Sequence, residues 1–255
     1  SKTYPYTILI TEDDDEVRCF LERELSPHFK TRTAANGKDA LRVLEEEEIS
    51  LVVSDVMMPE MNGFELCRMI KSQLPFSHIP VILLTALTDE RQRIFGITGG
   101  ADDYIQKPFH TDYVKIKIIH LLQERRKLRE RLLEKLRDNK LLLSEPEKVE
   151  SIDDAFLRKF AEQIEAVYAD PEYNVEKLSE TLGLSRGHLH RKIKELTGTS
   201  PVEFLRTYRL NKATQLLRQN AYTVSEVAYR TGFSSPAYFS KCFKAVYGVT
   251  PTEYQ

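Results

Sequence analysis

The chain has 255 residues, of which 41% are hydrophobic and 30% charged, and a formal net charge of −2. This composition excludes wholesale disorder, and the length suits about one or two domains. Because no apolar run approaches the roughly 18 residues of a membrane span and no secretory signal opens the sequence, we expect a cytoplasmic location. The three cysteines, Cys19, Cys67 and Cys242, are too scattered for a disulfide framework or a Cys-x-x-Cys metal site.

The small net charge conceals two halves of opposite sign. Residues 1–120 hold 20 acidic and 14 basic side chains, a net charge of −6. Residues 121–255 hold 19 acidic and 23 basic side chains, a net charge of +4. This asymmetry predicts an acidic site in the first half and an anionic partner for the second.

Short apolar runs alternate with helical patterns in the first half. The pattern predicts strands at about 6–11, 30–35, 51–54, 81–85 and 104–106. Between and after them it predicts helices at about 17–25, 38–47, 63–73, 90–98 and 111–123. Five strands that alternate with five helices predict a parallel sheet covered on both faces, with functional groups at the carboxyl ends of the strands.

Charged and polar side chains follow four of these strands. The acidic run 12–15 follows the first strand, Asp55 follows the third, Thr85 ends the fourth, and Lys107 follows the fifth. Carboxylate oxygens suit Mg²⁺, Asp55 could attack a phosphoryl group as a nucleophile, and Lys107 could offset the charge of that group. Each acidic residue alone could merely cap the next helix. Capping does not explain Thr85 and Lys107.

Residues 4–123 resemble the receiver domain of two-component response regulators, a flavodoxin-like α/β fold with a five-stranded parallel sheet and five helices. The matching motifs are ILITEDDDEVR, SDVMMPEMNGFEL, LLTA and GADDYIQKPF. Thr85 lies 30 positions and Lys107 lies 52 positions after Asp55, as in the family.

The resemblance implies a role for each matched residue. Asp55 would be the phosphoacceptor, Lys107 would pair with the phosphoryl group, and Thr85 with Tyr104 would form the switch pair. Glu12, Asp13, Asp55 and the backbone carbonyl of Met57 would bind Mg²⁺. Such a receiver catalyses only its own phosphorylation and slow dephosphorylation, so we do not expect an enzyme.

Residues 124–145 are strong helix formers of mixed charge without Gly or Pro. Four leucines would line one face of this helix: Leu121, Leu128, Leu132 and Leu136. A solvated connector helix and a dimerising coiled coil both fit, because the heptads are too few and irregular to decide. The expected organisation is a receiver at 1–123, a helical linker at 124–150 and a helical domain at 151–255.

The second half contains an internal repeat. The segment VEKLSETLGLS at 175–185 matches VSEVAYRTGFS at 224–234 with an offset of 49. After a one-residue insertion, residues 190–204 match 240–254 with an offset of 50. Two copies of one unit are therefore expected.

Each copy predicts two helices with a turn between them, which is a helix-turn-helix unit. The turns lie at Gly183 and Gly232, and the second helices end at Gly198 and Gly248, where a positive φ is needed. Residues 201–219 would join the copies as one helix, so we expect an all-α domain. The residues expected in its two small cores are Leu178, Leu184, Leu189, Ile193, Val227, Phe233, Phe239 and Phe243.

Basic side chains gather on the second helix of both units, and residues 171–255 carry a net charge of +5. They are Arg186, Arg191, Lys192 and Lys194 in the first copy and Lys241 and Lys244 in the second, with Arg206, Arg209 and Lys212 on the joining helix. Any one of them could simply be solvated. Their recurrence on both second helices favours double-stranded DNA, whose successive major grooves lie about 34 Å apart.

Residues 151–255 resemble the AraC/XylS-type DNA-binding domain. The motifs are LSETLGLSRGHLHRKIKELTGTSPVEFLRTYRLNKATQLL and VSEVAYRTGFSSPAYFSKCFKAVYGVTPTEYQ. The resemblance and the basic clusters together predict DNA contacts from Arg186, Gly187, His190, Arg191, Lys194, Pro236, Ala237, Ser240, Lys241 and Lys244.

These features predict a phosphorylation-activated, sequence-specific transcription regulator. Its partners would be a histidine kinase, double-stranded DNA and, on activation, a second copy of the chain, with RNA polymerase as a further candidate. The alternative is a phosphate-responsive module whose helical half binds protein. The domain order also resembles the C-terminal end of hybrid regulators, in which a membrane-anchored sensor kinase precedes the receiver, and a stand-alone regulator is the competing interpretation.

Overall fold

The computed structural model describes residues 4–86, 100–137 and 151–255. The chain forms two compact units, Ser1–Lys127 and Leu128–Gln255, and we describe each by itself. The division into a receiver, a linker and a helical domain at residues 123 and 150 stays a prediction. None of the helices within the described ranges has the length and apolar character needed to cross a membrane.

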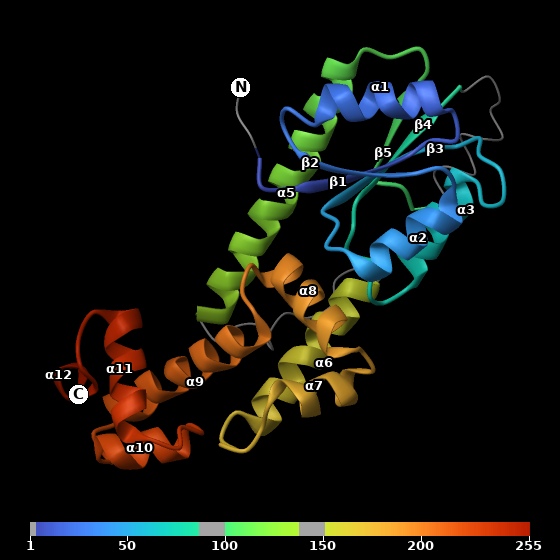
Figure 1. The fold of residues 1–255 in the computed structure, drawn as a ribbon. Helices are drawn as coiled ribbons and strands as arrows, with labels where there is room; N and C mark the ends of the chain where they lie inside the picture. Colours follow the sequence, from blue (N-terminus) through green and yellow to red (C-terminus); the bar gives the residue numbers. More distant parts are fainter. Residues whose placement is uncertain (1–3, 87–99, 138–150) are drawn as a thin grey trace. The chain divides into compact units, whose positions relative to one another are not determined.

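The first unit contains a five-stranded parallel sheet, as predicted (Figure 1). Its strands are β1 (Thr7–Thr11), β2 (Lys30–Ala34), β3 (Leu51–Asp55), β4 (Val81–Thr85) and β5 (Asp103–Gln106), in the order β2-β1-β3-β4-β5. Strands β3 and β4 are buried along their whole length because helices cover both faces. The carboxyl ends of β1, β3 and β4 therefore meet at the centre of one edge.

Two helical layers sandwich this sheet. They comprise α1 (Asp15–Leu25), α2 (Gly37–Glu46), α3 (Gly63–Ser72) and α5 (Thr111–Arg137). Helices α1 and α5 pack on one face through Leu21, Leu25, Val114 and Ile118. Helices α2 and α3 pack on the other through residues such as Leu44. The helix expected at 90–98 lies outside the described residues.

Helix α5 runs without a break through residue 123, where the receiver was expected to end, to Arg137, and so includes part of the helical linker expected at 124–150. The strong helix formers after residue 123 provide no stop signal. Leu121 packs partly against the core of the first unit, whereas Leu128 is 50% exposed. The side chains of Leu132 and Leu136 lie outside the described residues, so the connector and the coiled coil both remain predictions.

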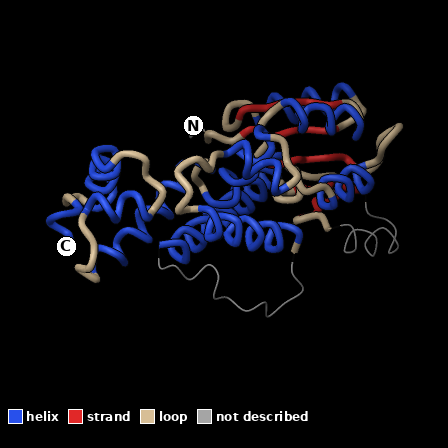
Figure 2. The backbone as a smooth tube through the Cα atoms, turned by 90° about the horizontal axis from the view of Figure 1, so that it is seen from below, coloured by secondary structure: helices blue, strands red, loops and turns tan. Residues whose placement is uncertain are grey.

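The second unit is helical, and Figure 2 shows strands only in the first unit. Its elements are α6 (Ile152–Val167), α7 (Val175–Leu182), α8 (Arg186–Thr197), α9 (Pro201–Arg218), α10 (Val224–Arg230), α11 (Pro236–Tyr247) and α12 (Pro251–Tyr254). Helices α7 and α8 form one helix-turn-helix unit and α10 and α11 the other. Helix α9 joins them, as the repeat predicted.

The repeat extends to the ends of its helices. Ser185 and Ser235 cap the N-termini of α8 and α11 with their hydroxyls. Gly198 and Gly248 end the same helices in the left-handed region, with φ of 77° and 78°. Capping boxes that begin at Ser200 and Thr250 start α9 and α12. The sequence match thus reports equivalent local structure in both copies.

Each helix-turn-helix unit has its own core. The eight side chains predicted for these cores are all buried, which confirms the prediction. In the first unit the ring of Phe160 on α6 packs edge-on against Phe204 of α9, 4.7 Å away. In the second, Phe239 and Phe243 of α11 pack with α10 and the C-terminal half of α9. Helix α9 therefore contributes its first turns to one core and its last turns to the other.

Candidate functional site

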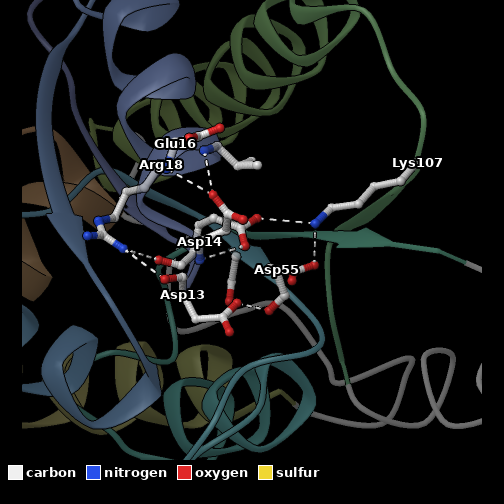
Figure 3. Close-up of polar contacts among 9 residues, drawn as sticks. Asp13, Asp14, Glu16, Arg18, Asp55 and Lys107 are labelled. Atoms are coloured by element: carbon white, nitrogen blue, oxygen red, sulfur yellow. Dashed lines mark hydrogen bonds and ion pairs between the residues drawn. The ribbon is translucent and has the colours of Figure 1, made fainter.

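Acidic side chains converge at the carboxyl edge of the sheet. Glu12 follows β1 directly, and Asp55 is the last residue of β3. The two strands are paired with Thr11 opposite Ser54, so Glu12 and Asp55 are neighbours. Ligand oxygens of Glu12, Asp13 and Asp55 all lie within 4.8 Å of one another (Figure 3). These three carboxylates could hold a metal ion.

Asp14 caps α1 and is not one of these ligands. Its carboxylate accepts hydrogen bonds from the backbone N–H groups of Glu16, at 2.9 Å, and Val17, at 3.1 Å. Capping thus accounts for Asp14, as the residue pattern allowed for one acidic residue after β1. Asp13 remains exposed at the cluster.

Arg18 supports the acidic loop from the first turns of α1. Its guanidinium Nη1 donates to the backbone carbonyls of Glu12, at 2.7 Å, and Asp13, at 3.4 Å, and pairs through Nη2 with Asp15 (Figure 3). Because it contacts carbonyls, it fixes the backbone while leaving the carboxylates of Glu12 and Asp13 available. Nothing in the residue pattern singles out Arg18.

Lys107 reaches the cluster from the loop after β5. Its Nζ lies 2.8 Å from Asp55 Oδ1 and 3.1 Å from Glu12 Oε2 (Figure 3). The Lys107 N–H donates to the Thr85 carbonyl at 2.7 Å, which ties this loop to the end of β4. The structure therefore brings together Glu12, Asp13, Asp55 and Lys107.

The electrostatics of the cluster favour a cation. Burial raises the pKa of Glu12, the negative charge of Asp55 raises it further, and Lys107 opposes both without cancelling them. Burial lowers the pKa of Lys107, but its hydrogen bonds and charge attraction to Asp55 and Glu12 outweigh this, so its pKa is raised overall. One ammonium thus balances three close carboxylates only in part, and a cation would relieve the remaining repulsion.

The loop after β3 returns tightly to the strand. The N–H of Gly63 donates to the Val56 carbonyl at 3.0 Å, and a Cβ on Gly63 would lie 2.2 Å from the Asp55 carbonyl oxygen. Only glycine permits this approach. Met57 lies within the loop with its side chain 68% exposed. That its carbonyl ligates a metal stays a prediction.

Thr85 and Tyr104 lie on one face of the sheet. Leu83 pairs with Tyr104 in adjacent parallel strands, and Thr85 is two residues after Leu83, so the three side chains project to the same side. Thr85 is 1% exposed. Tyr104 is half-buried against the α2–α3 core. Burial first, and then Cys67, raise the pKa of Tyr104 to about 12, so the phenol stays neutral.

In the helical unit, the ten residues predicted to contact DNA all keep solvent access. Six of them are exposed on α8 and α11 at their polar faces: Arg186, Gly187, His190, Lys194, Lys241 and Lys244. Ala237 is also exposed, and Arg191, Pro236 and Ser240 are partly exposed. Their contacts with DNA stay a prediction.

Lys192 does not belong with these residues, although it lies in the same basic run of the sequence. It is 0% exposed, and its Nζ lies 2.6 Å from Asp153 on α6 and 5.2 Å from the centre of the Phe156 ring. The helical period contained the signal, because Lys192 is three residues after Leu189 and four before Leu196, both buried. Lys192 is a core residue of the first helix-turn-helix unit.

Two basic residues of α9 are also structural. Arg209 donates from Nε to the Tyr168 carbonyl and from Nη2 to the Asp170 carbonyl, both at 2.7 Å. Lys212 pairs with Glu165 at 2.9 Å. Their side chains hold α9 against the end of α6, so charge alone overestimated the basic surface of this helix.

The comparisons with known families divide the chain as its two units do. Residues 8–119 match the response regulator receiver domain. Residues 178–255 match a helix-turn-helix domain. The chain joins a response regulator receiver domain to an AraC-type helix-turn-helix domain. Along the chain, the receiver domain comes first and the helix-turn-helix domain follows it.

Relatives match the receiver alone or nearly the whole chain. Histidine kinase P4 of Formosa agariphila is 39% identical over 98% of this chain and 18% of its own length. The transcriptional regulatory protein GltR of Pseudomonas aeruginosa is 43% identical over 46% of this chain and 49% of its own length. A receiver domain structure from a histidine kinase of Syntrophus aciditrophicus is 38% identical, covers 47% of this chain and 91% of its own, and has a TM-score of 0.45. The chain therefore spans half or less of the length of these two curated relatives.

Proposed function

We propose that phosphorylation of Asp55 controls sequence-specific binding of the helix-turn-helix domain to double-stranded DNA. The observation that carries this proposal is the contact of Lys107 with Asp55 within a cluster of three carboxylates at a receiver's sheet edge. A carboxylate that is buried yet reachable, with an ammonium beside it, suits the acceptance of a phosphoryl group.

In the proposed transfer, an Asp55 carboxylate oxygen attacks the phosphorus of a phosphohistidine. A P–O bond forms as the P–N bond breaks, and the imidazole leaves with the electron pair and takes up a proton. The ammonium of Lys107 would stabilise the charge that develops on the phosphoryl group, because its Nζ already lies 2.8 Å from Asp55 Oδ1. The receiver's part is limited to this transfer and to slow hydrolysis of the acyl phosphate.

We assign Mg²⁺ to the oxygens of Glu12, Asp13 and Asp55 and to the Met57 carbonyl. Hard carboxylate oxygens in a small set fit this ion, which keeps several waters beside a phosphate. When bound, Mg²⁺ would neutralise the phosphoryl oxygens. Arg18 would hold the loop that carries Glu12 and Asp13 through the two backbone carbonyls.

We propose that Thr85 and Tyr104 transmit the change. The Thr85 hydroxyl would move toward the phosphoryl oxygens and leave room beside β5, which the Tyr104 ring would enter. Their location on one face of adjacent strands supports this coupling. The altered surface would favour a homodimer, and pairing would raise DNA affinity through effective concentration.

The DNA surface is assigned to α8 and α11. Exposed Arg and Lys side chains would neutralise phosphates, while the N-terminal turns of both helices would face the base edges. Pro236 and Ala237 carry no hydrogen-bonding side-chain group, so at α11 they would contact thymine methyl groups. RNA polymerase is a proposed further partner of the bound dimer.

The Formosa relative supports a hybrid arrangement. It is named a histidine kinase, and its similarity spans 98% of this chain. We propose that the kinase that phosphorylates Asp55 can lie on the same polypeptide. A kinase acting in trans is the alternative, and the full natural gene distinguishes the two.

The deciding experiment is phosphorylation of the Asp55→Asn variant. Wild type incubated with radiolabelled acetyl phosphate and Mg²⁺ should gain an acid-stable, base-labile label that Asp55→Asn lacks. Asp112→Asn, which alters an exposed carboxylate on α5, should label normally. Retained labelling of Asp55→Asn would contradict the assignment.

Sedimentation tests the proposed dimer, and a binding assay tests the proposed recognition of DNA. Beryllofluoride, a phosphoryl mimic, should convert wild type, but not Asp55→Asn, to a dimer. Binding to random duplex at low salt should weaken steeply as salt rises. No binding at any salt would favour the alternative in which the helical half binds protein.

A further inference from the structure

Helix α9 is not the only connection between the two helix-turn-helix units. We infer that the turn after α6 forms a second tie, in which Arg209 and Gly232 are positioning residues that fix the orientation of α11 relative to α8. The functional reason for this tie rests on the proposed DNA binding, whereas the contacts that form it do not. We call Tyr168, Asp170, Arg209 and Gly232 the clasp.

The clasp begins where α6 ends. Tyr168 caps the C-terminus of α6, and its carbonyl accepts a hydrogen bond from Arg209 Nε at 2.7 Å. Arg209 Nη2 donates to the Asp170 carbonyl, also at 2.7 Å. One planar guanidinium thus binds two carbonyls of the same turn, which fixes the turn on the middle of α9.

Neighbouring contacts make this junction rigid. The Tyr168 ring packs edge-on against Tyr208, with ring centres 5.8 Å apart. Lys212 Nζ lies 5.4 Å from the centres of both rings and 2.9 Å from Glu165. Burial lowers the pKa of Arg209, which agrees with a guanidinium partly withdrawn from water. The end of α6 therefore moves with α9.

At Gly232 the second helix-turn-helix unit meets the same turn, the one that follows α6. It is buried in the turn between α10 and α11, with φ of 80°. A Cβ at this position would lie 2.1 Å from the Tyr168 carbonyl oxygen and 2.8 Å from Arg209 Nε. Both distances are far below ordinary van der Waals contact. The backbone of the second helix-turn-helix unit thus touches the turn after α6, the helix that packs on the first helix-turn-helix unit.

The equivalent glycine of the first copy makes no such contact. Gly183 also has a positive φ, 68°, yet a Cβ there would meet nothing within 4 Å. Gly248, with φ of 78°, is equally open. Backbone conformation therefore explains glycine at all three positions, but only Gly232 also needs the space. This difference between the copies indicates a contact between the units.

A fixed orientation matters because two recognition helices must enter successive major grooves together. If α11 moved freely about α9, DNA binding would have to order it. The conformational entropy lost in this ordering would lower the affinity for DNA. Pinning α11 from two sides removes that loss.

The test measures the separation of the two units without DNA. Spin labels at Glu180→Cys on α7 and Ala245→Cys on α11, in a Cys19→Ser, Cys242→Ala background of the full chain, report their distance distribution by pulsed electron resonance. Both labelled positions are exposed. Wild type should give one narrow distribution. Gly232→Ala and Arg209→Gln should broaden or shift it, while Gly183→Ala and Arg218→Gln should not.

These controls are matched to the variants. Gly183→Ala introduces the same backbone strain without the clash. Arg218→Gln alters an arginine of the same helix that donates to the Tyr254 hydroxyl, within the second helix-turn-helix unit. If Gly232→Ala fails to fold by circular dichroism, Arg209→Gln decides alone. An unchanged distribution in folded Arg209→Gln, or equal broadening in Gly183→Ala, would overturn the inference.

A DNA measurement separates the clasp from the proposed function. On a random duplex of about two helical turns, the slope of log affinity against log salt counts neutralised phosphates. If only one unit engages at a time in Gly232→Ala, its slope should fall to roughly half that of wild type. If wild type binds no duplex but the spin-label result holds, the DNA proposal fails and the clasp stands. An unchanged slope together with an unchanged distribution contradicts the clasp.

Discussion

Lys107 Nζ lies 2.8 Å from Asp55 Oδ1, although the two residues are 52 positions apart in the chain. The contact depends on the sheet, since Asp55 ends β3 and Lys107 follows β5, with β4 between them. The same ammonium lies 3.1 Å from Glu12, which is 2% exposed. Lys107 therefore links three strand ends through charge, and its removal should be felt in stability as well as in phosphotransfer.

Lys107→Met should lower the unfolding free energy of the metal-free receiver by about 1–2 kcal/mol, because Glu12 and Asp55 lose their shared cation in a partly screened site. Saturating Mg²⁺ should stabilise this variant more than it stabilises wild type, since the ammonium no longer competes with the ion. Urea unfolding with EDTA and with Mg²⁺ measures both effects.

Lys38→Met provides the control for that experiment. The ion pair between Lys38 and Glu60 is exposed on both sides, so its loss should change stability by less than about 0.5 kcal/mol. Equal losses in Lys107→Met and Lys38→Met would mean that the Lys107 contacts contribute no more than a surface pair.

The three cysteines should differ sharply in their reaction with a thiol reagent. Cys19 is exposed, Cys242 is half-buried, and Cys67 is buried in the α2–α3 core. Burial raises the pKa of Cys67 to about 11, so its thiol stays protonated at pH 8 and reacts slowly. Mass mapping after iodoacetamide should find Cys19 modified first and Cys67 only on unfolding. Rapid native labelling of Cys67 would be inconsistent with its position in the core.

Some features of the fold and of the site follow from the sequence pattern, and others do not. The strands, their carboxyl-end residues and the repeat were predictable because period and spacing are local properties. The helical character of residues 124–137 was also predictable, but its continuity with the last helix of the receiver was not, since nothing in strong helix formers marks a domain edge. Arg18 was missed, and Arg209 was assigned to the basic surface, for another reason: each acts on backbone carbonyls, which no residue pattern records. Gly232 was recognised for its positive φ, whereas its contact with Tyr168 exists only in three dimensions.

The capping boxes should make the helical unit sensitive to acid. Hydrogen bonds from the backbone and hydroxyl of Ser200, Thr223 and Thr250 lower the pKa of Glu203, Glu226 and Glu253, respectively, from the usual 4.5. A carboxyl whose pKa is lowered by folding stabilises the native state above its unfolded pKa. That contribution is lost as pH falls below about 4.5 and through the folded pKa.

Unfolding of the helical unit, followed by circular dichroism between pH 6 and about pH 3, should therefore show falling stability in wild type. Replacing the three glutamates by glutamine should flatten this part of the profile, because the amide keeps a hydrogen-bond acceptor but does not titrate. Glu162→Gln, which changes an exposed carboxylate inside α6, should leave the profile as it is. A triple variant with the wild-type slope would exclude the caps as its source.

Lys192 and Lys194 offer the sharpest separation of structural from DNA-binding charge, since they are two residues apart on α8. Lys192 is buried against Asp153, whereas Lys194 is exposed. Lys194→Met should lower the slope of log affinity against log salt by about 0.9, the value for one phosphate contact. Lys192→Met should keep the slope and instead lower the unfolding free energy by about 1–2 kcal/mol, because Asp153 loses its partner. A folded Lys192→Met variant could instead lower the salt slope as much as Lys194→Met does. The Lys192–Asp153 pair would then have to open on DNA, and α8 would bind through a face that is buried in the absence of DNA.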